Sequence, residues 1–455
     1  MTLSSNGSPS RVRALRGAAL TLVDDPFVVG DTAALRHEAD ALIVIRDGRI
    51  EAFGPYDSLR DRLPDDVPVT HHRDALIVPG FIDSHVHYPQ TGIMGSGGKR
   101  LIDWLNDYTF VAEAQFGDFV HATAVADVFL DECLAHGTTT AAVYCTVHPA
   151  SVDAFFSVAE ARGLRMIAGK TLMDRNAPDG LLDTPQRAYD ESLALIERWH
   201  GRGRLSYAVT PRFAPTSTPA QLEAAGALLA RRPEVYCQTH IAEQRDEVEW
   251  ARSLFPERID YLDVYDHHGL IGPRTLLGHG IYLSEREWQR CHDAGATIVH
   301  CPTSNAFLGS GLFDWSQAKR PSRPVSVALA TDVGGGTTLS MLATMGAAHQ
   351  LAQLGEHRLS PAQSFHLATR GAATALSLED RIGSIAPGLE ADLVVLDIGH
   401  SALTRLRLRH CRDIGDVLFM LMTLGDDRAV REVYIMGEPR VASNRDTATA
   451  EAQAF

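Results

Sequence analysis

The middle of the chain alternates short apolar runs with longer amphipathic stretches. The runs that predict strands are residues 77–78, 138–144, 165–169, 205–209, 235–239, 275–277, 297–299 and 325–330. Helical patterns separate them, for example over residues 219–231 and 285–294. Strands that alternate with helices predict a parallel sheet. Eight such units predict an α/β protein with a closed (β/α)₈ barrel of the TIM type.

Both ends of the chain have a different pattern, with short strands and tight turns. Strands are expected at 18–23, 41–45 and 49–53, with Asp47-Gly48 as a hairpin turn, and again at 391–397 and 431–436. We therefore expect one small β-sandwich domain built from residues 1–75 and 385–443. The barrel, residues 76–384, is inserted between these two parts, and residues 444–455 form a flexible tail.

Composition narrows the class of protein. At 455 residues the chain has room for one large domain and a smaller one, and its net charge of −15 argues against a nucleic-acid-binding surface. No apolar run reaches the roughly 18 residues of a spanning helix, so no membrane partner is expected. Six cysteines without a C-x-x-C spacing indicate buried thiols in a reducing cytoplasm.

Candidate chemistry gathers at the ends of the predicted strands, where barrel enzymes carry their active sites. His85 and His87 follow strand one, and residues two apart on a strand point the same way. The later strand ends supply the remaining candidates, which are His240 with Glu243 on strand five, His279 on strand six and Asp332 on strand eight. Three imidazoles and one carboxylate suit a single zinc or ferrous ion with a position left for water.

The motifs around these residues resemble the amidohydrolase superfamily, and among its members the mononuclear nucleobase deaminases. The stretches that carry the resemblance are Pro79 to Gln90, Thr210 to Phe213, Gln238 to Glu243, His300 to Asn305 and Thr331 to Gly335. The resemblance implies His85, His87, His240 and Asp332 as ligands of one Zn²⁺ per subunit, with Fe²⁺ as the alternative. It further implies Glu243 as a proton shuttle, His279 as a polarising group near the water, and a homodimer.

The stretch after His87 and the Pro-Arg-Phe triplet narrow the implied substrate to guanine, which would be deaminated to xanthine and ammonia in purine catabolism. Guanine presents acceptors at O6 and N7, where adenine presents a donor at N6. Arg212 has only donors, Gln90 can donate and accept, and Phe213 offers an apolar face. A structural ion pair for Arg212 and core packing for Phe213 are the alternatives to substrate contact.

Two metal-site alternatives are less compatible with the sequence. Relatives with two metals use a lysine at the end of strand four, but this strand ends in Thr210-Pro211-Arg212, and Lys170 near strand three is expected to be solvated or locally paired. The H-x-E and P-C-x-x-C pattern of zinc cytidine deaminases is absent from the chain. A single metal is therefore preferred.

Other functions remain open at this point. The same site could deaminate or dechlorinate another ring, such as 8-oxoguanine or a triazine. A non-enzymatic scaffold on this fold is disfavoured because every expected ligand is present. The long connection from Tyr88 to Phe116 is expected to cover the pocket and exclude water.

Overall fold

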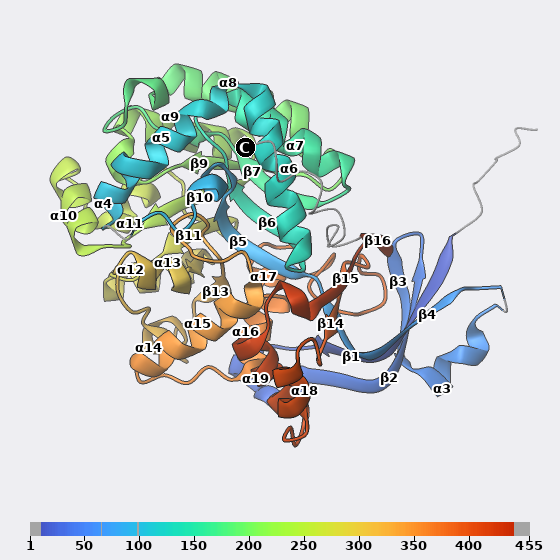
Figure 1. Ribbon diagram of the computed structural model, residues 1–455. Coiled ribbons are helices and arrows are strands. Elements are labelled where there is room, and N and C mark those ends of the chain that lie inside the picture. The colour runs from blue at the N-terminus through green and yellow to red at the C-terminus, as the bar shows by residue number, and fades with distance from the viewer. Residues whose placement is uncertain (1–10, 65, 98–99, 441–455) are drawn as a thin grey trace, which may run out of the picture.

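Eight parallel strands form a nearly closed barrel at the centre of the protein, which confirms the predicted fold class. The computed structural model describes residues 11–64, 66–97 and 100–440 (Figure 1). Hydrogen-bonded neighbours follow the order β13-β12-β11-β10-β9-β7-β6-β5, and the two-residue strand β8 pairs with β9. The strands are β5 (Phe81–His87), β6 (Thr138–Tyr144), β7 (Arg165–Gly169), β8 (Thr171–Leu172), β9 (Ser206–Pro211), β10 (Tyr236–Ile241), β11 (Thr275–His279), β12 (Thr297–His300) and β13 (Ser326–Leu329).

Helices surround the barrel, and a separate apolar layer fills its interior. The larger outer helices are α6 (Phe119–Ala135), α7 (Pro149–Ala161), α8 (Pro185–Trp199), α9 (Pro219–Arg231), α10 (Arg245–Leu254), α11 (Tyr261–Asp266), α12 (Glu285–Ala294), α13 (Pro302–Phe307), α15 (Met341–Leu354) and α16 (Pro361–Leu367). Inside, Ile82, Ile167 and Leu276 pack with alanines of α17 (Arg370–Ala375). Helix α17 therefore closes one end of the barrel and leaves the carboxyl ends of the strands for the site.

The first barrel strand differs from the prediction. The run at 77–78 belongs to β4 (Val69–Pro79), where Val78 pairs with Val394 of the terminal sheet. The barrel strand is the next one, β5, which begins after Gly80. A Cβ at Gly80 would lie 2.1 Å from Oγ1 of Thr139, so only glycine permits this close junction. Both runs are fully buried, so hydrophobicity alone did not distinguish them.

Strands from the two chain ends form one mixed sheet beside the barrel, where the blue and red segments meet in Figure 1. Its order is β16-β15-β14-β4-β1-β2-β3, and the additional strands are β1 (Val12–Leu22), β2 (Leu35–Arg46), β3 (Arg49–Pro55), β14 (Leu393–Asp397), β15 (Val430–Ile435) and β16 (Glu438–Arg440). Leu15, Ile43 and Val395 belong to one apolar core. The small domain is therefore built on a single continuous sheet. Asp47 and Gly48 have φ angles of 50° and 83°, in agreement with the predicted hairpin turn.

The remaining elements are short except for α19, which has 11 residues. They are α1 (Pro26–Val29), α2 (Asp31–Ala34), α3 (Tyr56–Leu59) and η1 (Arg60–Arg62) near the N-terminus, with η5 (Asp179–Leu181), η6 (Ala214–Thr216), α14 (Trp315–Ala318), α18 (Ala402–Leu408), α19 (Ile414–Leu424) and η7 (Asp427–Ala429) later. The predicted tail at 444–455 lies outside the described residues. Within the described ranges, no helix has the length and apolar character needed to cross a bilayer.

The connection after β5 is a series of short helical turns. They are η2 (Tyr88–Ile93), α4 (Leu101–Trp104), η3 (Leu105–Thr109), α5 (Phe110–Glu113) and η4 (Ala114–Gly117). Trp104, Leu105 and Phe110 are buried, which anchors this connection against the barrel. The connection therefore lies where it can contribute side chains to the site.

Candidate active site

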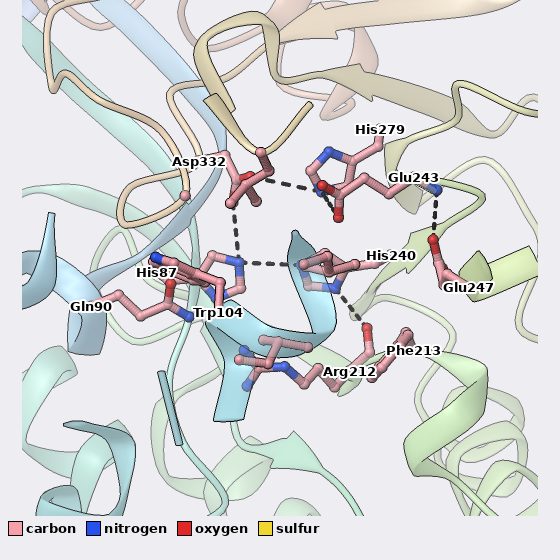
Figure 2. Close-up of a pocket in the computed structure, with 14 residues that line it drawn as sticks. His87, Gln90, Trp104, Arg212, Phe213, His240, Glu243, Glu247, His279 and Asp332 are labelled. Atoms are coloured by element: carbon pink, nitrogen blue, oxygen red, sulfur yellow. Dashed lines mark hydrogen bonds and ion pairs between the residues drawn. The ribbon is translucent and has the colours of Figure 1, made fainter. Parts of the chain in front are cut away.

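Four predicted side chains converge at the carboxyl ends of the barrel strands. His85 and His87 come from β5, His240 from β10, and Asp332 follows β13. Their potential ligand atoms all lie within 4.8 Å of one another. Figure 2 shows His87, His240 and Asp332 directed toward a common centre. The tertiary structure thus brings together residues that are up to 247 positions apart in the chain (332 minus 85).

The spacing of these atoms fits one shared divalent ion. Nε2 of His87 lies 3.2 Å from Nε2 of His85 and 3.2 Å from Nε2 of His240. Oδ1 of Asp332 lies 3.2 Å from Nε2 of His85 and 3.3 Å from Nε2 of His87. Two ligand atoms that each lie about 2.0–2.2 Å from one ion are about 2.8–3.6 Å apart when the angle between their bonds is about 90–110°. The donor set therefore matches zinc in both chemistry and size.

Surrounding groups hold the donors in the protonation states that a metal requires. Nδ1 of His240 lies 2.6 Å from the carbonyl oxygen of Arg212, so Nδ1 carries the proton and donates a hydrogen bond there. Nε2 is then unprotonated and can bind a metal through its lone pair. Burial lowers the pKa of His85 to about 4, which keeps its imidazole neutral. Burial acts to raise the pKa of Asp332, but the neighbouring imidazoles of His85, His87 and His279 outweigh it and hold that pKa well below its usual value, so the side chain is a carboxylate.

A second combination of potential ligands, His85, His279, Cys301 and Asp332, also lies within 4.8 Å. Cys301 would have to bind as a thiolate. Burial raises the pKa of its thiol well above the usual value, and Sγ points to the carbonyl oxygen of Val299 at 3.5 Å. The set with three histidines and Asp332 is therefore the better metal site.

Glu243 and His279 form a pair of buried titratable side chains beside this centre. Oε2 of Glu243 lies 3.5 Å from Nε2 of His279, which is also 3.7 Å from Oδ2 of Asp332. Burial raises the pKa of Glu243 to about 7, so this carboxyl can both accept and release a proton near neutral pH. Burial acts to lower the pKa of His279, but the Glu243 and Asp332 carboxylates outweigh it, and the net shift is upward.

Residues that the sequence analysis did not identify hold this pair in place. The Ser310 hydroxyl donates to Oε1 of Glu243 at 2.7 Å, and Nδ1 of His279 lies 2.9 Å from Oδ1 of Asn305. Oε2 of Glu247 accepts the backbone N–H of Glu243 at 2.7 Å. Asn305 lies within a motif already noted, whereas no local signal distinguished Ser310 or Glu247 from ordinary polar residues.

A pocket opens beside the centre, and His87, His240, Glu243, His279 and Asp332 lie in its wall. Its lining residues include Gln90, Arg212 and Phe213, all named from the sequence, and Trp104 from α4. In Figure 2, Arg212 and Phe213 lie on the opposite side of His240 from Glu243 and His279. The pocket thus places the Arg212 guanidinium and the Phe213 ring across from Glu243 and His279.

Two predicted alternatives have structural answers. Arg212 forms an ion pair with Glu113, whose Oε2 lies 2.7 Å from Nη1, so the predicted structural ion pair is present at a residue that also lines the pocket. Lys170 is fully buried and forms ion pairs with Asp183 and, at 3.3 Å, with Glu191. Lys170 is therefore locally paired rather than solvated.

Comparisons with known proteins agree on one family. A model described as "Amidohydrolase family" matches residues 76–440. Guanine deaminase of Escherichia coli K12 is 44% identical over 429 residues, which cover 94% of this chain and 97% of that one. A crystal structure of guanine deaminase from Bradyrhizobium japonicum has a TM-score of 0.92 at 37% identity and covers 95% of this chain and 100% of that one. A guanine deaminase from C. acetobutylicum with bound guanine has a TM-score of 0.84 at 27% identity, covering 94% and 100%.

Proposed function

The chain belongs to the amidohydrolase family, and on this premise we propose that it hydrolyses guanine to xanthine and ammonia, as a step of purine catabolism. The observation that carries the proposal is the pocket itself. One side holds a donor set that fits a divalent ion, and the other presents Arg212 and Gln90 to a flat heterocycle. The high identity to guanine deaminases along nearly the whole chain supports the same substrate.

We propose that His85, His87, His240 and Asp332 hold one Zn²⁺ per subunit, with Fe²⁺ as the alternative. When bound, such an ion lowers the pKa of water to about 7 and so supplies a nucleophile at neutral pH.

Proton movements are assigned to this chain's own residues. The water oxygen forms a bond to C2 of guanine, and the bond from C2 to the amino nitrogen breaks. Glu243 takes one water proton and gives it to a ring nitrogen, in keeping with its pKa near 7. Asp332 receives the second proton and delivers it to the departing amine, which leaves as ammonia. His279 orients the attacking water by a hydrogen bond.

Recognition of the base is assigned to the opposite side of the pocket. Arg212 donates to O6 of guanine, Gln90 contacts the mixed polar edge, and Phe213 packs on the ring. Among the described residues, Nε1 of Trp104 has no hydrogen-bond partner, so a purine acceptor would satisfy this buried donor. We infer that the connection carrying Trp104 shields the reaction from water.

Substrate comparison tests the proposal directly. Purified, zinc-loaded protein is offered guanine, adenine, 8-oxoguanine and an aminotriazine, and ammonia release is measured with the loss of guanine absorbance. We expect guanine to have the highest kcat/KM. A higher value for 8-oxoguanine or the triazine would favour the alternative substrate, and elemental analysis without a transition metal would favour a non-enzymatic protein.

The proposal also covers the oligomeric state of the protein and its place in the cell. We propose a homodimer in the cytoplasm, where the six cysteines, free in the structure, would stay reduced. Sedimentation of the purified protein at twice the mass of one chain is the expected result, and a monomer at working concentration would contradict the dimer.

A further inference from the structure

Glu113 lies behind the pocket and bridges the two side chains assigned to base recognition. Its Oε1 accepts a hydrogen bond from Nε2 of Gln90 at 2.9 Å, and its Oε2 accepts from Nη1 of Arg212 at 2.7 Å. All three residues are at most 3% exposed. Gln90 and Arg212 line the pocket and Glu113 does not, so the carboxylate acts on a ligand only through them.

Helix α5 holds Arg212 by two of its residues. Phe110 and Glu113 are three positions apart and therefore share one face of the helix. The guanidinium carbon of Arg212 lies 5.5 Å from the centre of the Phe110 ring, while its edge meets the Glu113 carboxylate. An arginine held by both its face and its edge retains few orientations.

The bridge also fixes the direction of the Gln90 amide. Nε2 donates to Glu113, and Oε1 accepts the backbone N–H of Gly334 at 3.3 Å. An amide held at both ends cannot exchange its donor and acceptor positions. Figure 2 shows Gln90 and Arg212 beside the same part of the pocket.

Charge is the second consequence of the bridge. An isolated guanidinium in a buried pocket attracts anions, whereas its ion pair with a carboxylate has no net charge. Guanine is a neutral base near neutral pH, while oxopurines such as its product xanthine lose a proton more readily. A neutralised arginine can still donate to a carbonyl oxygen, because only one of its five N–H groups faces Glu113.

We propose that Glu113 is a positioning residue for purine recognition, which orients Gln90 and Arg212 and makes the pocket select a neutral purine over an anionic one. This inference rests on the proposed function. The carboxylate sets the geometry of the donors and removes the positive charge that would otherwise retain the product.

The test is Glu113→Gln in the zinc-loaded protein. A neutral amide cannot accept from both partners, so we expect KM for guanine to rise about 10- to 100-fold, with kcat reduced no more than about threefold. We also expect the ratio of KM for guanine to the inhibition constant of xanthine, measured at a pH where xanthine is an anion, to rise at least about fivefold. Zinc content per chain should stay at the wild-type value.

Two further variants make the test specific. Glu223→Gln changes an exposed glutamate on α9 and should leave KM and xanthine affinity unchanged. Glu113→Asp keeps the charge but shortens the reach, so KM should rise while the preference between xanthine and guanine stays as in the wild type. This variant decides the matter if Glu113→Gln does not fold.

The outcomes separate this inference from the proposed function. Wild-type turnover of guanine with unchanged KM and xanthine affinity in the Glu113 variants would overturn the role of Glu113 and leave the function standing. A fall in kcat that matches a fall in zinc content or in the folded fraction of the Glu113 variants would also overturn the positioning role, because that pattern indicates a purely structural residue. A wild-type protein that neither binds nor deaminates guanine would overturn both.

Discussion

At the scale of single residues, the site contains backbone conformations that its side chains disfavour. Asp332, His279 and Ala242 have φ angles of 52°, 70° and 49°, in the left-handed region that is uncommon outside glycine. Such conformations typically cost about 1–3 kcal/mol each and persist where neighbouring contacts hold them. For Asp332, the backbone N–H donates to the carbonyl oxygen of His85 at 2.9 Å. Contacts with distant parts of the chain thus hold the backbone of Asp332 in a conformation that its own local preference disfavours.

Replacement of Glu243 by Gln tests the proton carrier at the same scale. We expect kcat to fall about 10²- to 10⁴-fold, because the amide cannot accept and release the proton. Zinc content, measured by elemental analysis, should be unchanged, since Glu243 is outside the proposed ligand set. Near-normal turnover by Glu243→Gln would remove this residue from the mechanism.

At the scale of elements, hydrogen bonds join β5 to the chain after β13. These bonds close the barrel, and they also fix the two segments that carry His85, His87 and Asp332. The N–H of His87 donates to the carbonyl oxygen of Val333 at 2.8 Å. Oδ1 of Asp83 accepts from the backbone N–H of Thr331 at 3.0 Å, and Oδ2 accepts from the Thr331 hydroxyl. The side chain of Asp83 thus connects the first and last strands directly below their proposed ligands.

Asp83→Ala should therefore weaken metal binding without removing a ligand. Loss of a buried group that orients ligands typically lowers metal affinity about 10- to 100-fold. The measurement is zinc retained during titration with a chelator, with the exposed Asp57→Ala as the matched control. Equal retention by Asp83→Ala and the control would show that the strand junction does not support the site.

At the scale of the whole molecule, a buried ion network joins the barrel to the terminal sheet. Glu390, just before β14, pairs with Arg165 of the barrel at 2.5 Å and with Arg204 at 2.7 Å. Its side chain is 3% exposed, and those of Arg165 and Arg204 are 7% and 11% exposed. One carboxylate thus forms ion pairs with two arginines that lie more than 180 positions away in the chain.

Glu390→Gln should destabilise the protein strongly. Removing one partner of a buried ion pair typically costs about 3–5 kcal/mol, because the charge left behind stays buried. Here Arg165 loses its carboxylate partner, whereas Arg204 keeps its ion pair with Asp392. We expect a thermal midpoint several degrees lower by calorimetry. Asp40→Asn, which breaks the more exposed pair with Arg16, should change the midpoint little. Similar midpoints for both variants would contradict a stabilising role for the network.

The stability of the whole fold is also expected to depend on pH, and His300 contributes to this dependence. The ring is buried against Phe313 at 4.7 Å between centroids, and burial lowers the pKa of His300 to about 3. Between about pH 6.5 and 3 the unfolded chain binds a proton that the folded chain excludes, so stability falls as the pH falls. His300→Phe removes this contribution.

The thermal midpoints of wild type and His300→Phe, compared from pH 7.5 to 5, should diverge in favour of the variant as the pH falls. The expected limit is about 1.4 kcal/mol per pH unit below the pKa of the unfolded imidazole. Because both proteins carry the same metal site, effects of metal loss cancel in the difference. A difference that does not depend on pH would mean that His300 titrates normally.

The sequence alone predicted the barrel and the meeting of His85, His87, His240 and Asp332 at its strand ends, and the structure shows both. Strand and helix periods are local, and parallel strands place their carboxyl ends together, so the ligands at strand ends could be expected to meet. The assignment of residues 77–78 to the barrel was wrong, because two consecutive buried runs have the same composition and only their pairing partners differ.

Only the tertiary structure identified Glu113, Ser310, Asp83 and Glu390 as partners of the site and of the domain junction. Each is a common polar residue whose role comes from a contact with a distant part of the chain, and no local pattern records such a contact. Burial then decides their chemistry, since the same carboxylate that is inert in water becomes a strong orienting or stabilising group when it is excluded from solvent.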